Sequence, residues 1–263
     1  DTRPLNIVNS DNRILANAVR LRLEPVFNEW VSDNQRGFLP GRSMLANVID
    51  VDHAMMEAAL RQDRALAVFF DFKAAFPSVA HRFLLEALEE LQLPPWVVRF
   101  VSLLYRDNNC QLAVGGAKHA GFAIHSGIRQ GCPLSPLLFA IAADVLLRRL
   151  TRLMPDLILR AYADDLAAVV PGGMNSVPQL AHIFHEFAQV SCLRLNLPKT
   201  VVVPLSVEDQ EVTTAALQRV APSWVGVRVA GAAKYLGFYL GPERGHTAME
   251  KPLLKYVQRA TEW

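Results

Sequence analysis

The amino-acid sequence predicts an α+β fold, in which long helices alternate with a few short strands. Three observations support this class. Apolar residues recur at helical spacing in several long segments, short apolar runs of strand-like composition lie between those segments, and 51% of the 263 residues are hydrophobic. This content is ample for a sizeable core. Because both kinds of segment alternate along the chain, a mixed architecture is favoured over an all-helical or an all-strand one.

Helical spacing is clearest near the N-terminus, where the recurring apolar residues are Ile14, Leu15, Val19, Leu23 and Phe27. This pattern predicts a helix over residues 11–30. The same criterion predicts further helices over residues 47–61, 82–92, 95–105, 136–154, 177–190 and 209–220.

Strands are predicted where a short apolar run ends at turn-forming residues. Residues 157–159 and 166–170 flank a sharp polar break and predict a β-hairpin. A second hairpin is predicted from residues 110–114 and 122–124, which flank two glycines. Single strands are expected at residues 67–70, 201–203 and 234–240.

The polar break of the first hairpin carries two adjacent acids, Asp164 and Asp165. Two negative charges at a hairpin tip repel each other, and a bound cation would relieve that repulsion. A solvated turn is the alternative, because Asp is a good turn former. The choice between the two depends on partner residues elsewhere in the chain.

Asp71 is the best partner, because it ends the continuous apolar run at residues 67–70. A carboxylate at the end of a buried strand can converge with the hairpin acids although they lie far along the chain. Carboxylate and water oxygens suit magnesium better than zinc. The alternative for Asp71 is the N-cap of a following helix.

Seven segments of the chain form an ordered set, at residues 3–7, 33–43, around Asp71, and at 127–136, 162–165, 195–200 and 234–238. In this order they resemble the motifs of a reverse transcriptase catalytic core, specifically that of a non-LTR (LINE-like) retrotransposon. The segment Gly-Ile-Arg-Gln-Gly-Cys-Pro-Leu-Ser-Pro at residues 127–136 is long and highly specific. The resemblance covers nearly the whole chain.

The resemblance implies the right-hand polymerase architecture, with fingers and a palm whose antiparallel sheet is flanked by helices. We expect a reverse transcriptase domain over residues 1–242, with fingers at about 1–64 and palm at about 65–242. In an alternative division, part of the fingers is inserted into the palm. Residues 243–263 would form the start of a thumb or a connector, so the thumb is missing or only begun. The abrupt beginning inside the first motif indicates an excised core or a fragment.

The implied activity is that of an RNA-directed DNA polymerase, a nucleotidyltransferase that adds deoxynucleotides to a primer 3′-hydroxyl by two-metal phosphoryl transfer. Its cofactors would be two Mg2+ ions, with Mn2+ as a substitute. Its partners would be an RNA template, a DNA primer and deoxynucleoside triphosphates. We expect Asp71 and Asp164 to bridge the ions. Asp165 ranks third, because successive side chains of a strand point to opposite faces.

The resemblance also gives candidate roles outside the acids. Phe76 matches a bulky residue beneath the nucleotide sugar, where its ring would clash with a 2′-hydroxyl. Gln130 offers donors and acceptors to a nucleotide or template, and Lys199 matches a lysine that would protonate departing pyrophosphate. The alternatives are a core aromatic for Phe76, an ordinary Gly/Pro turn around Gln130 and a surface lysine for Lys199.

The resemblance also implies residue roles in the fingers and at the primer. Arg3 and Arg42 are candidates for triphosphate contacts, because the arginine fork donates bidentately to phosphate. The primer grip would include Tyr235, Leu236 and Gly237, and a strand in the core is the alternative for Tyr235.

The overall composition adds few constraints. The near balance of 27 basic and 25 acidic residues is not typical of a nucleic-acid binder. Any affinity for nucleic acid must therefore come from local clusters of basic residues. Three widely spaced cysteines indicate neither a zinc site nor a disulfide framework, which favours a reducing intracellular compartment. The resemblance points to the nucleus, although no targeting signal and no membrane span is evident. The oligomeric state stays open.

The sequence leaves three rival functions. A catalytically degenerate scaffold that binds RNA would be expected to lose the acids, yet all three are present. A polymerase with another template or ribonucleotides would keep the same palm, and Phe76 argues against ribonucleotides. A magnesium-dependent nuclease or phosphatase would not explain the ordered motifs.

Overall fold

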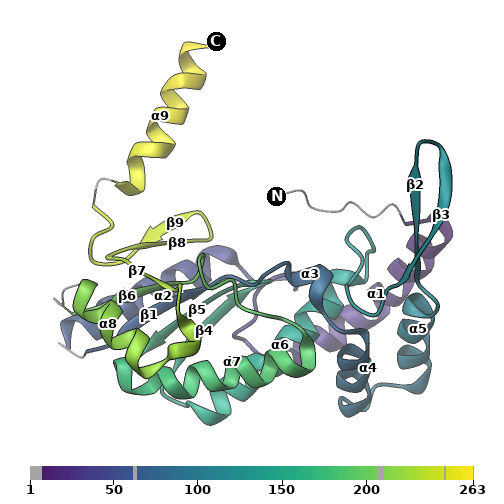
Figure 1. The fold of residues 1–263 in the computed structure, drawn as a ribbon, viewed down its shortest axis with the longest axis horizontal. Coiled ribbons are helices and arrows are strands. Elements are labelled where there is room, and N and C mark those ends of the chain that lie inside the picture. Colours follow the sequence, from purple (N-terminus) through teal and green to yellow (C-terminus); the bar gives the residue numbers. More distant parts are fainter. Residues whose placement is uncertain (1–7, 62–63, 207–209, 246, 263) are drawn as a thin grey trace. The chain divides into compact units, whose positions relative to one another are not determined.

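The computed structural model describes residues 8–61, 64–206, 210–245 and 247–262. The chain forms two compact units (Figure 1). The first, called unit 1, comprises Asp1–Ser32, Lys73–Leu146 and His185–Arg194. The second, called unit 2, comprises Asp33–Phe72, Leu147–Phe184 and Leu195–Trp263. The chain therefore passes between the units several times.

The helices are α1 (Ser10–Trp30), α2 (Met44–Leu60), α3 (Ala75–Ser78), α4 (His81–Glu90), α5 (Pro95–Tyr105), α6 (Ser135–Leu153), α7 (Val177–Ser191), α8 (Gln210–Val220) and α9 (Thr247–Thr261). The strands are β1 (Leu66–Phe70), β2 (Asn109–Val114), β3 (Ala117–Ala123), β4 (Ile158–Tyr162), β5 (Asp165–Val170), β6 (Val201–Pro204), β7 (Arg228–Val229), β8 (Ala233–Tyr235) and β9 (Phe238–Leu240).

Unit 2 is built on a five-stranded sheet in the order β4-β5-β1-β6-β7. The pairs β4/β5, β5/β1 and β1/β6 are antiparallel, as the resemblance implies. The edge strand β7 departs from that expectation, because it runs parallel to β6. The sheet is therefore mixed, with an antiparallel centre.

Both faces of the central strands are covered, because alternate residues of a strand point to opposite faces. One set packs with α2 in a hydrophobic core of unit 2, and the members of this core from β1, β5 and β6 are Ala67, Phe69, Ala167, Val169, Val201 and Val203. Phe70 belongs to the other set. Its ring stacks on Phe184 of α7 with the centroids 4.5 Å apart. Covering both faces explains why the strands are almost wholly apolar.

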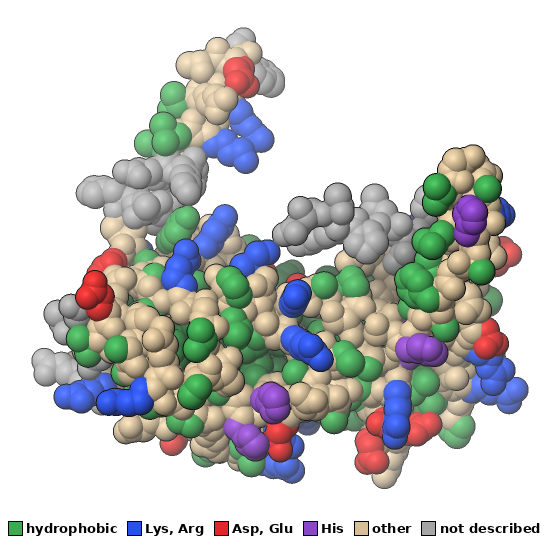
Figure 2. Space-filling model, in the orientation of Figure 1, with side chains coloured by type: hydrophobic (Ala, Val, Ile, Leu, Met, Phe, Trp, Pro, Cys, Tyr) green, Lys and Arg blue, Asp and Glu red, His purple; other side chains and the backbone are tan. Residues whose placement is uncertain are grey.

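Unit 1 is mainly helical and carries the β2/β3 hairpin. Phe76 of α3 stacks on Phe139 of α6, with centroids 4.5 Å apart and planes inclined by 14°. The buried carboxylate of Asp144 accepts hydrogen bonds from the backbone N–H and the hydroxyl of Ser32. The hairpin itself is exposed along its length except at the half-buried Cys110, and Figure 2 shows hydrophobic side chains on its surface.

The predicted helices are all present, and their ends lie close to the expected ones. Both predicted hairpins also form. The segment at residues 234–240 is different, since it forms two strands around a turn at Leu236 and Gly237. Both turn residues have positive φ, 48° and 94°, as a tight hairpin turn of type I′ requires. The assignment of fingers, palm and thumb to residue ranges stays a prediction.

Three whole-chain features bear on the environment of the protein. Cys110, Cys132 and Cys192 are all free. None of the described helices combines the length and the hydropathy that spanning a bilayer requires. On the face drawn in Figure 2, Lys and Arg side chains stand in several small groups, in line with the near balance of charges.

Candidate active site

Two of the three candidate acids meet at one end of the sheet of unit 2. Asp71 directly follows β1, and Asp165 opens β5. These strands pair with Phe70 opposite Leu166, so the same register continued by one residue sets Asp71 opposite Asp165. Opposed residues of an antiparallel pair present their side chains to the same face. The two carboxylates therefore share one face at this end of the sheet.

The third acid, Asp164, lies in the two-residue turn that joins β4 to β5, where Tyr162 pairs with Asp165. Its neighbour Ala163 has a φ of 58°. This left-handed conformation costs a residue with a Cβ about 1–2 kcal/mol. The turn that carries Asp164 is therefore strained and needs support from its surroundings.

Gln35 supplies that support from the segment between α1 and α2. Its side-chain Nε2 donates to the carbonyl of Ala163 over 3.1 Å. Its Oε1 accepts the N–H of Ala163 at 2.9 Å and the N–H of Gly37 at 2.8 Å. Two N–H donors converge on one atom, which identifies that atom as the amide oxygen.

Gly37 allows this segment to approach the turn closely. A Cβ built on Gly37 would stand 2.1 Å from the backbone nitrogen of Ala163. No side chain fits at that distance, and the backbone of the turn cannot rotate out of the way as a flexible side chain can. A glycine at position 37 is therefore required for the contact.

We expect Gly37→Ala to lower the free energy of unfolding by about 3 kcal/mol, since overpacking against backbone usually costs that much or somewhat less. Thermal unfolding followed by circular dichroism measures this. Asp33→Ala changes an exposed residue of the same segment and should stay within about 0.5 kcal/mol of the wild type. Equal stability of the two variants would contradict the close approach.

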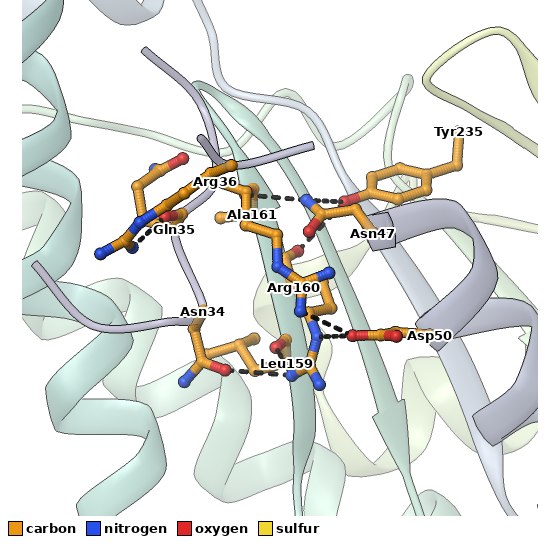
Figure 3. Close-up of polar contacts among 10 residues, drawn as sticks. Asn34, Gln35, Arg36, Asn47, Asp50, Leu159, Arg160, Ala161 and Tyr235 are labelled. Carbon is orange, nitrogen blue, oxygen red and sulfur yellow. Dashed lines mark hydrogen bonds and ion pairs between the residues drawn. The ribbon is translucent and has the colours of Figure 1, made fainter. Parts of the chain in front are cut away.

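A second group of polar contacts holds β4, the strand that leads into the turn (Figure 3). The buried Asn47 of α2 donates from Nδ2 to the carbonyl of Ala161 over 2.8 Å. Asp50 accepts hydrogen bonds from Arg160 and Arg36, each at 2.8 Å. Burial alone would raise the pKa of the Asp50 carboxyl, but the two guanidinium groups outweigh it and hold that pKa below its usual range. Strand β4 is thus tied to α2 by both neutral and charged contacts.

The backbone of Asp71 is held by the loop that precedes β6. The N–H of Asn196 donates to the carbonyl of Asp71 over 2.7 Å. The N–H of Asp71 donates to the hydroxyl of Thr200 over 3.4 Å. The exposed Lys199 belongs to the same loop, so the candidate general acid is carried by the segment that fixes the candidate metal ligand.

These contacts decide one of the alternatives for Asp71. The N-cap position of α3, the next helix, is occupied by Ala74. Asp71 is therefore not the cap of that helix. The solvated-turn alternative for the two hairpin acids stays open, since Asp164 is half-buried and Asp165 is exposed.

The candidates Phe76 and Gln130 belong to unit 1. Phe76 is half-buried and stacked on Phe139, so both the core-aromatic and the sugar-contact interpretations fit it. Gln130 lines a pocket of about 340 Å³ within unit 1. Its neighbour Arg129 also lines this pocket and donates to the amide oxygen of Asn108. Their roles towards a nucleotide stay predictions.

The remaining candidates are placed as follows. Arg3 lies outside the described residues. Arg42 donates from Nη1 to the carbonyl of Gln35 over 2.6 Å, so it braces the segment that contacts the turn. Tyr235 is buried, and its ring lies 5.6 Å from that of Phe69. Burial is also the main reason why the pKa of its phenol is raised. Only the turn at Leu236 and Gly237 leaves part of the predicted primer grip accessible.

Among the described residues, no group of three or more His, Cys, Asp or Glu side chains stands close enough to hold a metal ion. The donor chemistry nevertheless fits a hard divalent cation, because the acids offer oxygen alone. Magnesium is commonly bound through one or two carboxylates, with water and substrate phosphates completing its shell. A pair of carboxylates at a sheet end is compatible with that mode.

The sequence does not indicate which residues support the turn. Gln35 and Gly37 lie in the segment at residues 33–43 that resembles a reverse transcriptase motif, but nothing in their own pattern indicates which residue they contact. The one sequence feature that points to them is the pattern Gln-x-Gly, in which an amide side chain and a glycine lie two residues apart within a polar segment. Ala163 gave no signal, since alanine ordinarily avoids positive φ.

The sequence of this chain is similar to those of known proteins. A family model described as reverse transcriptase (RNA-dependent DNA polymerase) matches residues 1–240. The chain is 29% identical over 251 residues to the transposon TX1 uncharacterized 149 kDa protein of Xenopus laevis, covering 92% of this chain and 19% of that protein. It is 32% identical over 152 residues to the retrovirus-related Pol polyprotein from type-1 retrotransposable element R2 of Nasonia vitripennis, covering 56% of this chain and 14% of that protein.

Among solved structures, the telomerase of Candida tropicalis in complex with a fragment of telomeric RNA resembles this chain, with a TM-score of 0.61 at 13% identity. The likeness covers 86% of this chain and 36% of the telomerase chain. At this identity it shows a shared fold and nothing further. The chain also spans only a small part of the curated relatives, 19% and 14% of the two proteins above.

Proposed function

The chain belongs to the reverse transcriptase (RNA-dependent DNA polymerase) family, and on that premise we propose that it is the polymerase core of a non-LTR retrotransposon protein. It adds deoxynucleotides to the 3′-hydroxyl of a DNA primer on an RNA template, and pyrophosphate leaves. The observation that carries the proposal is that Asp71 directly follows β1 and Asp165 opens the paired strand β5, at the sheet end next to the turn of Asp164.

Asp71, Asp164 and Asp165 would hold the divalent cations, which we propose to be two Mg2+ ions, with Mn2+ as a substitute. When bound, such ions lower the pKa of the attacking hydroxyl and neutralise the charge on the phosphates. The protein's own task is to present carboxylate oxygens at fixed positions. Asp71 is fixed through its backbone by the β6 loop, and Asp164 through the turn that Gln35 contacts.

Lys199 is proposed to donate a proton to the departing pyrophosphate. The residue is exposed, and its loop is hydrogen-bonded to the backbone of Asp71. A positioned general acid contributes roughly 10²-fold or more to a rate.

We therefore expect Lys199→Ala to lower kcat about 10²-fold with little change in KM for the nucleotide. Lys199→Arg should restore only part of the loss, since a guanidinium keeps the charge but is a poor proton donor. Single-nucleotide incorporation at several pH values measures both variants. Lys118→Ala, a change of an exposed lysine in unit 1, is the control. A kcat unchanged by Lys199→Ala would remove Lys199 from the chemistry.

Phe76 and Gln130 are proposed to contact the incoming nucleotide, Phe76 beneath the sugar and Gln130 at the base or template. Arg3 and Arg42 are proposed as triphosphate contacts, and Leu236 and Gly237 with Tyr235 as the primer grip. Template, primer and deoxynucleoside triphosphates are the proposed partners. A reducing intracellular compartment, and specifically the nucleus, is the proposed location.

Primer extension tests the proposed function. The wild-type chain is given a DNA primer on RNA or DNA templates, with deoxy- or ribonucleotides, in the presence of Mg2+ or EDTA. The proposal expects template-directed deoxynucleotide addition on RNA that EDTA abolishes. If RNA is bound but no nucleotide is added under any condition, the chain is a binding scaffold instead.

A further inference from the structure

The turn at Ala163 and Asp164 cannot hold its own shape. Ala163 adopts φ of 58°, which β-hairpin turns usually reserve for Gly, Asn or Asp. An alanine in this conformation persists only where its surroundings impose it. The surroundings that touch the backbone of Ala163 are therefore part of what directs the Asp164 side chain.

Gln35 is the side chain that bonds both backbone polar groups of Ala163, accepting from its N–H and donating to its carbonyl. The amide is fully buried, with 0% of the residue exposed. Its oxygen also accepts the N–H of Gly37. Water cannot replace a bond at this depth, so loss of the amide would leave buried backbone groups without partners.

The backbone around Gln35 is itself anchored to the same hairpin. The N–H of Ala161 donates to the carbonyl of Asn34 over 2.7 Å, and the N–H of Arg36 donates to the carbonyl of Ala161 over 2.8 Å. Gln35 and Ala161 thus form a parallel bridge (Figure 3). Arg42 adds a hydrogen bond to the carbonyl of Gln35. The amide is held from behind and reaches the turn in a fixed direction.

We propose that Gln35 is a positioning residue, whose side-chain amide locks Ala163 in the left-handed conformation and thereby fixes the direction of the Asp164 carboxylate. The inference rests on the proposed function only for its catalytic consequence. The structural part concerns the turn alone.

Asn47 provides a matched comparison. It is also a fully buried amide, with 0% of the residue exposed, and it also bonds the hairpin. It donates to the hydroxyl of Tyr235 and to the carbonyl of Ala161, within β4, and that carbonyl keeps a second donor in the N–H of Arg36. Removing either amide should cost stability, but only removal of Gln35 should free the turn.

The test compares Gln35→Met, Gln35→Glu and Asn47→Ala with the wild type. Methionine keeps the length of the side chain and removes all three hydrogen bonds. Glutamate keeps an acceptor for the two N–H groups and loses only the donor to Ala163. If Gln35→Met fails to fold, Gln35→Asn replaces it in the same measurements with the same expected results, because its amide is one methylene shorter and falls short of Ala163.

The first measurement is amide hydrogen exchange at Ala163, which does not depend on activity. We expect exchange at Ala163 to be at least tenfold faster in Gln35→Met, and unchanged in Asn47→Ala. In Gln35→Glu this amide should stay protected, because its acceptor remains. Equal protection of Ala163 in Gln35→Met and the wild type would overturn the proposal.

The second measurement is single-nucleotide incorporation over a range of Mg2+ concentrations, with Mn2+ binding followed by electron paramagnetic resonance. Gln35→Met should lower kcat at least tenfold at unchanged KM for the nucleotide, and weaken Mn2+ binding. Asn47→Ala should keep kcat within about twofold even at matched loss of thermal stability. If both variants lose kcat only in proportion to stability, Gln35 is an ordinary core residue. An inactive wild type would reject the proposed function. The hydrogen-exchange result would still show whether Gln35 holds Ala163 in its left-handed conformation.

Discussion

Replacing Asp71 or Asp164 by asparagine is expected to abolish primer extension while leaving the fold intact. Asparagine has nearly the same size and shape but carries no charge, so it cannot neutralise a divalent cation. Loss of about 4 kcal/mol of transition-state stabilisation corresponds to roughly a 10³-fold lower rate. Single-turnover incorporation measures the rate, and circular dichroism checks the fold.

The control for these variants is Asp156→Asn. Asp156 is an exposed acid of the same unit, in the turn before β4 and so at the other end of that strand from Asp164. It loses the same charge, and we expect it to extend primers at the wild-type rate. A normal rate in Asp71→Asn would contradict the assignment of that residue as a metal ligand.

Asp165→Asn separates two arguments about the third acid. The sequence ranks Asp165 below Asp164, because neighbouring residues of a strand point to opposite faces. The register of β1 and β5, by contrast, would place Asp165 opposite Asp71 on one face if it continued one residue beyond Phe70 and Leu166. A loss as large as that of Asp71→Asn would favour the register argument, and a modest loss would favour the ranking from sequence.

The second large effect is expected from Phe76→Ala, which should raise the use of ribonucleotides relative to deoxynucleotides. The ring of Phe76 is held by its stack on Phe139, so it would meet a 2′-hydroxyl as a fixed obstacle. Removal of one steric clash is worth about 1–3 kcal/mol, or roughly 5- to 150-fold in the ratio of kcat/KM values. Incorporation assays with matched pairs of nucleotides give that ratio.

Phe83→Ala is the control for lost packing. Phe83 also belongs to unit 1, and its ring meets Phe187 edge to face at 5.6 Å. Its loss should reduce stability without changing the choice of sugar. No change of selectivity in Phe76→Ala would assign that residue to the core alone.

Much of the fold could be predicted from sequence, because the local pattern carries it. The helical spacing of apolar residues fixed α1 and α5 closely, and the polar break between two apolar runs located the β4/β5 hairpin. The place of Asp71 at the end of a buried strand was likewise local information. The two-residue strand β7 was not predictable, since so short a segment has no periodicity.

The support of the turn could not be predicted for a different reason. Gln35 and Ala163 are 128 positions apart, and their contact depends on a positive φ that the sequence does not indicate. The burial of Tyr235 is a similar case. Its motif resembles a primer grip, but its hydroxyl lies in the interior, where it donates to the carbonyl of Arg160 and accepts from Asn47. Long-range packing decides such positions.

The most direct test of the account is RNA-templated incorporation of a single deoxynucleotide by the wild type, Asp71→Asn and Asp156→Asn, measured side by side with Mg2+. The account predicts addition of only the complementary deoxynucleotide by the wild type and by Asp156→Asn, and none by Asp71→Asn. Incorporation by Asp71→Asn at the wild-type rate would contradict the claim that the acids at this end of the sheet form the polymerase site.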